Sequence, residues 1–155
     1  MMSKRRGNNG YFVLTGIGKN SFVFQDAYHI RIKVFSEEQG ISKNNELDEY
    51  DDTAYHCVIY IGDIPIACAR MNIIKDTAKI CRIAVMKESR RCGYATLLCK
   101  HIISIAQQRG AKYAYLHAQT NISDLYRKIG FISEGETFIE EGIPHVRMIK
   151  KLSTS

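Results

Sequence analysis

Arg90-Arg91-Cys92-Gly93-Tyr94-Ala95-Thr96 is a basic, glycine-bearing turn between two apolar runs of different periodicity. The run before it, residues 78–85, is rich in apolar and β-branched side chains and predicts a strand that ends near Met86. The run after it repeats apolar side chains at helical spacing and predicts a helix, which Gly110 ends with a left-handed cap.

The chemistry of this turn suits an anion. A helix start presents unpaired backbone N–H groups and about half a positive charge. Gly93 has no Cβ, so an anion can approach the backbone closely, and Arg90 and Arg91 add positive charge. We therefore predict a phosphate-binding turn. The alternative is an ordinary strand-to-helix connection with two solvated arginines.

The remaining chain also alternates between strand and helix patterns. A helix is predicted from Ser21 to about Gln39, where Gly40 ends it. Further strands are predicted at residues 11–17, 55–61, 64–73, 113–119, 131–138 and 145–152, with Gly62-Asp63 as a hairpin turn. A short helix at residues 121–128 carries Tyr126, and Gly130-Phe131 follows it.

This order of elements resembles the GNAT superfamily of N-acetyltransferases, over about residues 78–150. The matching order is a strand, an Arg-x-x-Gly-x-Ala turn, a helix, a strand, a helix with Tyr126, and Gly-Phe. Earlier and later motifs are similar to the ElaA-like or YjcF-like branch of small GNAT enzymes. These motifs are Val34-Phe35, Glu38-Gln39-Gly40-Ile41, Glu46, Asp48, Asp51, His56, Arg70, Glu141-Gly142-Ile143 and His145.

The predicted fold is α+β with three layers: a mixed, mostly antiparallel sheet of six to seven strands with helices on both faces. The chain has no repeat and no low-complexity linker, so we expect one domain at residues 11–152 after a disordered lead at residues 1–10. That lead carries Lys4, Arg5 and Arg6 without an apolar core, which predicts neither a signal peptide nor a transit sequence.

The resemblance implies direct transfer of an acetyl group from acetyl-CoA to an amine. It implies that backbone groups of Ile83, Ala84 and Val85 bind the pantetheine arm, and that the amides of the turn surround the pyrophosphate. The turn residues concerned are Arg90, Arg91, Cys92, Gly93, Tyr94 and Ala95. Gln119 would bond the cofactor amide, while Ile122 departs from the alanine that is usual in the family.

Tyr126 stands where the family places the acid that protonates the departing CoA thiolate. A phenol with a pKa near 10 is protonated at neutral pH and can donate to a sulfur anion. Taken alone, a tyrosine in a short helix is more often a packing residue. Groups that could bind the acceptor or accept its proton are Glu46, Asp48, Asp51, His56, Arg70, His117, Glu141 and His145. The alternative for the three carboxylates at 46, 48 and 51 is a solvated loop. The alternative for His56 and His145 is a hydrogen-bonded histidine within a strand.

Charge is distributed unevenly along the 155 residues. The whole chain has a formal charge of +6, while residues 37–52, the acidic segment, hold seven carboxylates against Lys43. A basic body suits a polyanion such as coenzyme A, and an acidic segment suits a cationic amine or solvent. The chain has no nucleic-acid motif and no metal-ligand spacing, so we expect neither a nucleic-acid partner nor a metal.

The five cysteines form no CxxC pair and accompany no secretion signal, which predicts reduced thiols in a cytoplasmic protein. Cys57, Cys68 and Cys81 lie in apolar runs and are predicted to be core residues. No apolar stretch is long enough to span a membrane.

The most specific expectation from the resemblance is acetylation of an amino-sugar phosphate such as glucosamine 6-phosphate, in amino-sugar metabolism and UDP-GlcNAc biosynthesis. Arg70, Lys128 and Arg147 are the candidates for its phosphate. Rival acceptors are a polyamine, an aminoglycoside or a protein amine, and a non-catalytic acyl-CoA-binding module is a rival of another class. Small GNAT enzymes are often dimers, so a homodimer is a further expectation.

Overall fold

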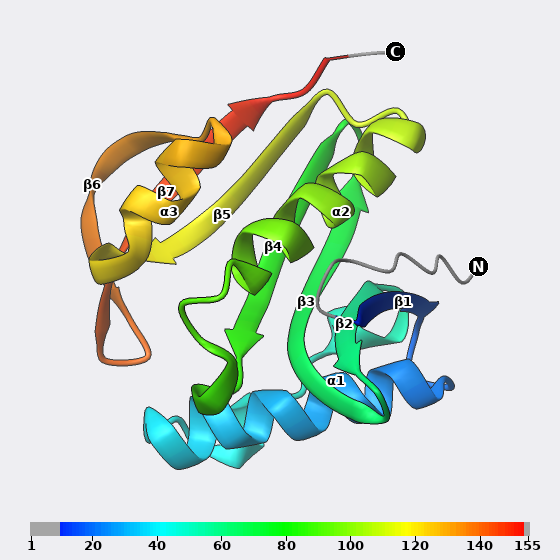
Figure 1. Ribbon diagram of the computed structural model, residues 1–155. Coiled ribbons are helices and arrows are strands. Elements are labelled where there is room, and N and C mark those ends of the chain that lie inside the picture. The colour runs from blue at the N-terminus through cyan, green and yellow to red at the C-terminus, as the bar shows by residue number, and fades with distance from the viewer. Residues whose placement is uncertain (1–9, 154–155) are drawn as a thin grey trace.

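The structure, a computed structural model, describes residues 10–153 and contains one seven-stranded sheet in the order β1-β2-β3-β4-β5-β7-β6 (Figure 1). All neighbouring strands are antiparallel except β4 and β5, which are parallel. This confirms the predicted mixed, mostly antiparallel sheet. The strands are β1 (Tyr11–Ile17), β2 (Tyr55–Ile61), β3 (Ile64–Ile74), β4 (Thr77–Val85), β5 (Tyr113–Gln119), β6 (Ile132–Glu140) and β7 (Ile143–Lys151).

Helices cover both faces of the sheet. The α-helices are α1 (Phe22–Arg31), α2 (Tyr94–Gln108) and α3 (Ser123–Ile129). Short 3-10 turns lie at Lys43–Asn45, Glu49–Asp52, Lys87–Ser89 and Thr120–Ile122. Residues 1–9, most of the predicted disordered lead, lie outside the described range. Between residues 10 and 153, no helix combines the length and apolar character needed to cross a membrane.

Two apolar cores follow from the alternation of side chains along the strands. Cys57 and Ile59 on β2 point to the α2 face, where fully buried Leu98 and Ile102 pack against them and their neighbours. Val58 points to the opposite face, toward α1. Burial of one such aliphatic side chain stabilises the fold by about 1.5–3 kcal/mol. Because side chains alternate between the two faces of a strand, the apolar residues on each face determine which helix packs there.

The first helix differs from its prediction. Ser21 caps α1 as expected, since its hydroxyl accepts a hydrogen bond from the Phe24 amide at 3.2 Å. The helix does not continue regularly to Gln39, because Ile32–Glu38 forms a π-helix, η1, that begins directly after Arg31. Wider π-helical turns change the direction in which later side chains point.

Strands β4 and β5 separate after a short parallel ladder. Their pairing covers only Thr77–Lys79 against Tyr113–Tyr115. Beyond this ladder the two strands do not pair with each other, and Figure 1 shows them diverging. The unpaired parts are Ile80–Val85 of β4 and Leu116–Gln119 of β5. The sheet is therefore open at its centre, and the functional site lies in this opening.

Candidate active site

A cavity of about 710 Å³ occupies the opening between β4 and β5. Its walls come from the separated strands, the π-helix, the acidic segment, the turn before α2, α3 and the β6–β7 hairpin. Such a volume lies within the range of pockets that bind small molecules and cofactors. The residues predicted to bind the cofactor or the acceptor line it except Cys92, Asp51 and His56. The phosphate candidates Lys128 and Arg147 do not line it either.

A β-bulge in β4 shapes one wall of the cavity. Cys68 pairs with Ala84 and Arg70 pairs with Cys81, so one residue of β3 lies opposite two residues of β4, Arg82 and Ile83. Arg82 adopts a left-handed conformation, with φ of 55°. A bulge bends its strand and redirects a side chain, and the regular apolar pattern of residues 78–85 gave no sign of it.

The turn before α2 presents backbone N–H groups to the cavity. Gly93 is the N-cap residue in a left-handed conformation, with φ of 81°, and no side chain caps this helix. A Cβ built on Gly93 would meet no atom within 4 Å, so the space beside the backbone is open. The turn therefore fits a phosphate group held by amides and by the helix dipole.

The two arginines of the turn differ in their surroundings. Arg90 donates from Nε to the Val85 carbonyl at 3.0 Å and from Nη2 to Glu38 at 2.8 Å, so its charge is partly neutralised. Arg91 lies in the left-handed region and lines the cavity. Arg91 is thus the arginine of this turn that is better placed to attract an anion.

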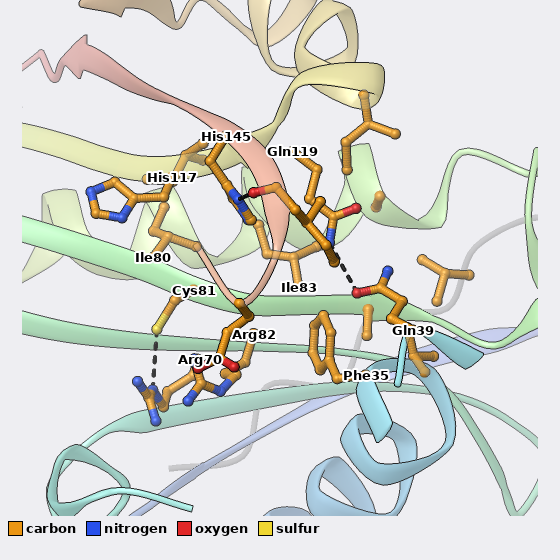
Figure 2. Close-up of a pocket in the computed structure, with 18 of the residues that line it drawn as sticks. Phe35, Gln39, Arg70, Ile80, Cys81, Arg82, Ile83, His117, Gln119 and His145 are labelled. Carbon is orange, nitrogen blue, oxygen red and sulfur yellow. Dashed lines mark hydrogen bonds between the residues drawn. The ribbon is translucent and has the colours of Figure 1, made fainter. Parts of the chain in front are cut away.

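Tyr126 and Gln119 both line the cavity. The Tyr126 ring packs edge-on against Phe131 and is 4% exposed, yet it lines the cavity. Burial, with a smaller effect from Cys99, raises the pKa of Tyr126 above the usual phenol range. Gln119 donates from Nε2 to Gln39 Oε1 at 3.0 Å and so links the end of β5 to the residue after the π-helix (Figure 2).

Six charged side chains form a closed ring beneath the cavity, here called the ion-pair ring. Its members in order are Arg31, Glu46, Arg82, Asp48, Arg70 and Asp51. The N–O distances around the ring run from 2.8 to 3.4 Å. The longest of these distances joins Arg82 to Asp48. Arg82 Nε lies 3.1 Å from Glu46, but the angle of this contact is not that of a hydrogen bond, so the two groups form an ion pair only. Three cations and three anions balance, so most of the acidic segment's charge beside the cavity is neutralised.

Burial explains why this ring must be complete. Burial alone would disfavour the charged form of Arg31, but hydrogen bonds and the charges of Asp51 and Glu46 outweigh it and raise the Arg31 pKa. Burial would likewise raise the pKa of Asp51, but Arg31 and the other hydrogen bonds hold it below its usual range. The ring joins α1, the acidic segment, β3 and β4 into one wall.

His56 lies beneath the ring and not in the cavity. It is fully buried, its Nε2 lies 3.1 Å from the Asp51 carbonyl, and its ring packs edge-on against Phe24. Nδ1 has no hydrogen-bond partner among residues 10–153. Burial, with contributions from the nearby arginines, lowers the pKa of His56.

A second polar cluster lies on the other wall and consists of His117, Glu140 and His145, here called the His-Glu-His cluster. His117 Nδ1 lies 3.1 Å from Glu140 Oε1, and His145 Nε2 lies 3.7 Å from Glu140 Oε2. His145 Nδ1 donates to the Ile143 carbonyl at 2.7 Å. Figure 2 shows His145 extending into the cavity beside Gln119, while the His117 ring points away from it.

Known proteins agree with this architecture. Residues 25–152 match the model of the acetyltransferase (GNAT) domain family. The chain belongs to the GNAT family of acetyltransferases. It is 35% identical over 136 residues to YjcF of Bacillus subtilis, described as an uncharacterized N-acetyltransferase, covering 86% of this chain and 96% of YjcF. YyaT of the same organism is 34% identical over 131 residues, which cover 83% of this chain and 88% of YyaT.

Solved structures support the fold of this GNAT acetyltransferase. An N-acetyltransferase structure from Lactobacillus plantarum superposes with a TM-score of 0.85 at 28% identity and covers 94% of this chain and all of its own. Escherichia coli ElaA superposes with a TM-score of 0.81 at 24% identity, and the superposition covers 90% of this chain and 99% of ElaA. The sequence-based resemblance to GNAT enzymes with YjcF-like and ElaA-like relatives is confirmed, and acetyl-CoA is the cosubstrate that the fold implies.

Four polar residues of this GNAT acetyltransferase were not anticipated as site residues: Arg31, Lys79, Arg82 and Glu140. Arg31 falls on the apolar face of its helix, next to Ile30 and four residues after Ala27. A charged residue on a face that is otherwise buried indicates a buried ion pair, and this pattern could have identified Arg31 from the sequence. Glu140 shares a strand face with Phe138, whose cross-strand partner is His145. Cys81 was predicted as a core residue, but it is only partly buried and lines the cavity, with Arg70 Nε 3.2 Å from its sulfur.

Proposed function

We propose that this chain transfers the acetyl group of acetyl-CoA directly to a small primary amine inside the β4–β5 cavity. The observation that carries the proposal is the opening itself. It exposes one edge of β4 between the amide-lined turn of α2 and the polar groups of the opposite wall. An extended amide-bearing chain such as pantetheine can bond to an open strand edge as another strand would.

The cofactor roles assigned from the sequence are retained as proposals. Backbone groups of Ile83, Ala84 and Val85 would bind pantetheine, and Gln119 would bond a cofactor amide. Tyr126 would donate its proton to the sulfur. A raised phenol pKa keeps that proton in place at neutral pH, and burial in an apolar wall excludes competing water.

For the acceptor, we propose an amine that also carries an anionic group, with glucosamine 6-phosphate as the leading example. Lys79 Nζ lies 5.9 Å from the centre of the Tyr115 ring, and the Arg147 guanidinium lies 4.1 Å from the same centre. Within residues 10–153 neither cation is paired with a carboxylate, and Lys79 lines the cavity. A phosphate needs such charge-assisted partners. Arg70, one of the three candidates from the sequence, is 3% exposed and already bonded to Asp48 and Asp51.

The rival acceptors are cationic: a polyamine, an aminoglycoside or a protein amine. The acidic segment was their main support, but Arg31, Arg70 and Arg82 balance Glu46, Asp48 and Asp51. Among the described residues, the carboxylates on the cavity wall that no arginine neutralises are then Glu140 and Glu141 of the β6–β7 hairpin, which suit one ammonium group. A homodimer is also a proposal, which sedimentation velocity of the full chain tests.

The deciding experiment measures free CoA release with acetyl-CoA and a panel of amines, followed by mass spectrometry of the products. The panel contains glucosamine, glucosamine 6-phosphate, spermidine, an aminoglycoside and a lysine peptide. Turnover with glucosamine 6-phosphate well above that with glucosamine supports the proposed acceptor. Preference for spermidine or the peptide supports a rival. No acetylated product from any amine, together with stabilisation by CoA, would point to a non-catalytic binding module.

A further inference from the structure

We propose that His145 is the catalytic base of the acetyl transfer, that Glu140 is its positioning residue, and that His117 passes the proton to solvent. This inference rests on the proposed function. It assigns the proton acceptor, which the sequence left open among seven candidates, and it adds Glu140, which was not among them.

The hydrogen bonds of His145 decide which of its nitrogens can accept a proton. A carbonyl oxygen can only accept a hydrogen bond, so the 2.7 Å contact with Ile143 keeps a hydrogen on Nδ1 in every protonation state. The titrating atom is therefore Nε2. The His145 side chain is 9% exposed and lines the cavity, so Nε2 acts in a partly desolvated site where it can meet the acceptor amine.

Glu140 is placed to stabilise the proton once His145 has taken it. Its Oε2 lies 3.7 Å from His145 Nε2, which is within ion-pair range but too long for a hydrogen bond. An imidazolium formed at His145 would attract this carboxylate, whereas neutral imidazole would not. Phe138 stacks on the His145 ring with centroids 6.0 Å apart and holds its orientation.

The other oxygen of Glu140 connects the cluster to solvent. Oε1 lies 3.1 Å from His117 Nδ1. In the tautomer that carries its hydrogen on Nε2, His117 can accept a proton from Glu140 at Nδ1 and release the Nε2 proton to solvent. The His117 side chain is 27% exposed, three times the exposure of His145. The three side chains thus form a path from the cavity to the surface, each from a different strand: β7, β6 and β5.

The proton balance gives each group one task. His145 Nε2 takes one proton from the acceptor ammonium, and the freed nitrogen lone pair forms the new C–N bond. The C–S bond breaks with its electron pair on sulfur, and Tyr126 donates a proton to that sulfur. The new amide nitrogen loses a second proton. One of the two amine protons restores Tyr126 and the other leaves through Glu140 and His117.

Several charged groups surround this base and must be considered in any pH profile. They are Glu140 and Glu141 on the β6–β7 hairpin, His117 on β5, and Arg82 and Asp48 on the opposite cavity wall. The ion-pair ring already balances the last two. Glu140 is therefore the carboxylate whose removal most directly changes the proton affinity of His145.

The test compares His145→Gln, Glu140→Gln and the control Glu136→Gln, an exposed carboxylate of β6 that does not line this cavity. We expect His145→Gln to lower kcat by about 100-fold with the KM for acetyl-CoA unchanged. We expect Glu140→Gln to lower kcat by about tenfold and to move the acidic limb of the kcat/KM profile to lower pH, because a weaker base stays unprotonated further into acid. Glu136→Gln should match the wild type.

Nitrogen-15 NMR of the histidine rings supplies a readout that needs no turnover. The Glu140→Gln variant should shift the His145 titration to lower pH and leave that of exposed His29 unchanged. An unmoved His145 titration, or full kcat in His145→Gln at every pH, would overturn the relay. If no amine is acetylated but the His145 titration moves as expected, the proposed function fails while the Glu140–His145 coupling stands.

Discussion

Arg31 donates two hydrogen bonds to the carboxylate of Asp51, at 2.8 and 3.1 Å, and both side chains are almost completely buried. This pair joins the end of α1 to the acidic segment directly beneath the cavity. Desolvation of both ions is costly, and the bonds among the ring members offset that cost. The wall of the cavity therefore depends on charges that the acceptor never touches.

We expect Arg31→Met to destabilise the protein by about 3–5 kcal/mol, because it leaves Glu46 and Asp51 buried without their main partner. Urea unfolding followed by circular dichroism measures the change. The matched control is Lys33→Met, which removes the exposed Lys33–Glu37 pair and should cost less than about 1 kcal/mol. Equal losses in the two variants would show that the ring carries no special energetic role.

We expect stability to fall as pH drops from about 7.5 toward 5.5, because the unfolded chain protonates His56 near pH 6.5 while the folded chain, with its lowered pKa, does not. The unfolded state then binds more protons, so stability rises with pH in this window. His56→Gln should flatten the slope by up to about 1.4 kcal/mol per pH unit. His29→Gln, at an exposed position, should keep it. The idea fails if the His56 variant retains the wild-type slope.

We expect Gly93→Asp to abolish most of the thermal stabilisation that coenzyme A gives, since a carboxylate would meet the pyrophosphate at the amide-lined turn. Ligand at about 100 times its Kd stabilises by about 2.7 kcal/mol, a shift that melting curves resolve. Gly110→Asp is the control. Gly110 has a similar φ of 85°, also has open space around its Cβ position, and lies at the other end of α2. Equal stabilisation of both variants by coenzyme A would refute the assignment of the turn.

We expect Lys79→Met to raise the KM for glucosamine 6-phosphate by about tenfold or more, the scale of one charge-assisted hydrogen bond. The KM for glucosamine should change little in the same variant, because glucosamine lacks the phosphate. Lys100→Met, on the outer side of α2, should change neither constant. Equal kcat/KM for the two sugars in the wild type would contradict an anionic acceptor.

Local sequence patterns were sufficient for most elements of the fold, and most of the residues predicted to bind the cofactor line the cavity. The turn Gly62-Asp63, the left-handed Gly110 and the strand at residues 113–119 were all predicted correctly. Each depends on residues that are adjacent in the sequence, where φ preference and side-chain alternation act directly.

The bulge and the ion-pair ring on the cavity wall could not be predicted, because they depend on contacts between distant elements. The bulge at Arg82 arises from the register between β3 and β4, and Arg31 meets Asp51 across 20 positions of sequence. The acidic segment was expected to face solvent or a cationic amine, but three of its seven carboxylates are instead bound by arginines from α1, β3 and β4. No single-sequence pattern identifies which arginine meets which carboxylate.

The rate of the chemical step in Tyr126→Phe tests the central claim most directly, with rapid mixing of enzyme, acetyl-CoA and the best amine of the panel in a single turnover. Phenylalanine preserves the packing against Phe131 and removes only the hydroxyl. We predict unchanged affinity for acetyl-CoA, an unchanged fold and a rate lower by about tenfold or more. A single-turnover rate equal to that of the wild type would contradict the account, because Tyr126 would then be only a packing residue.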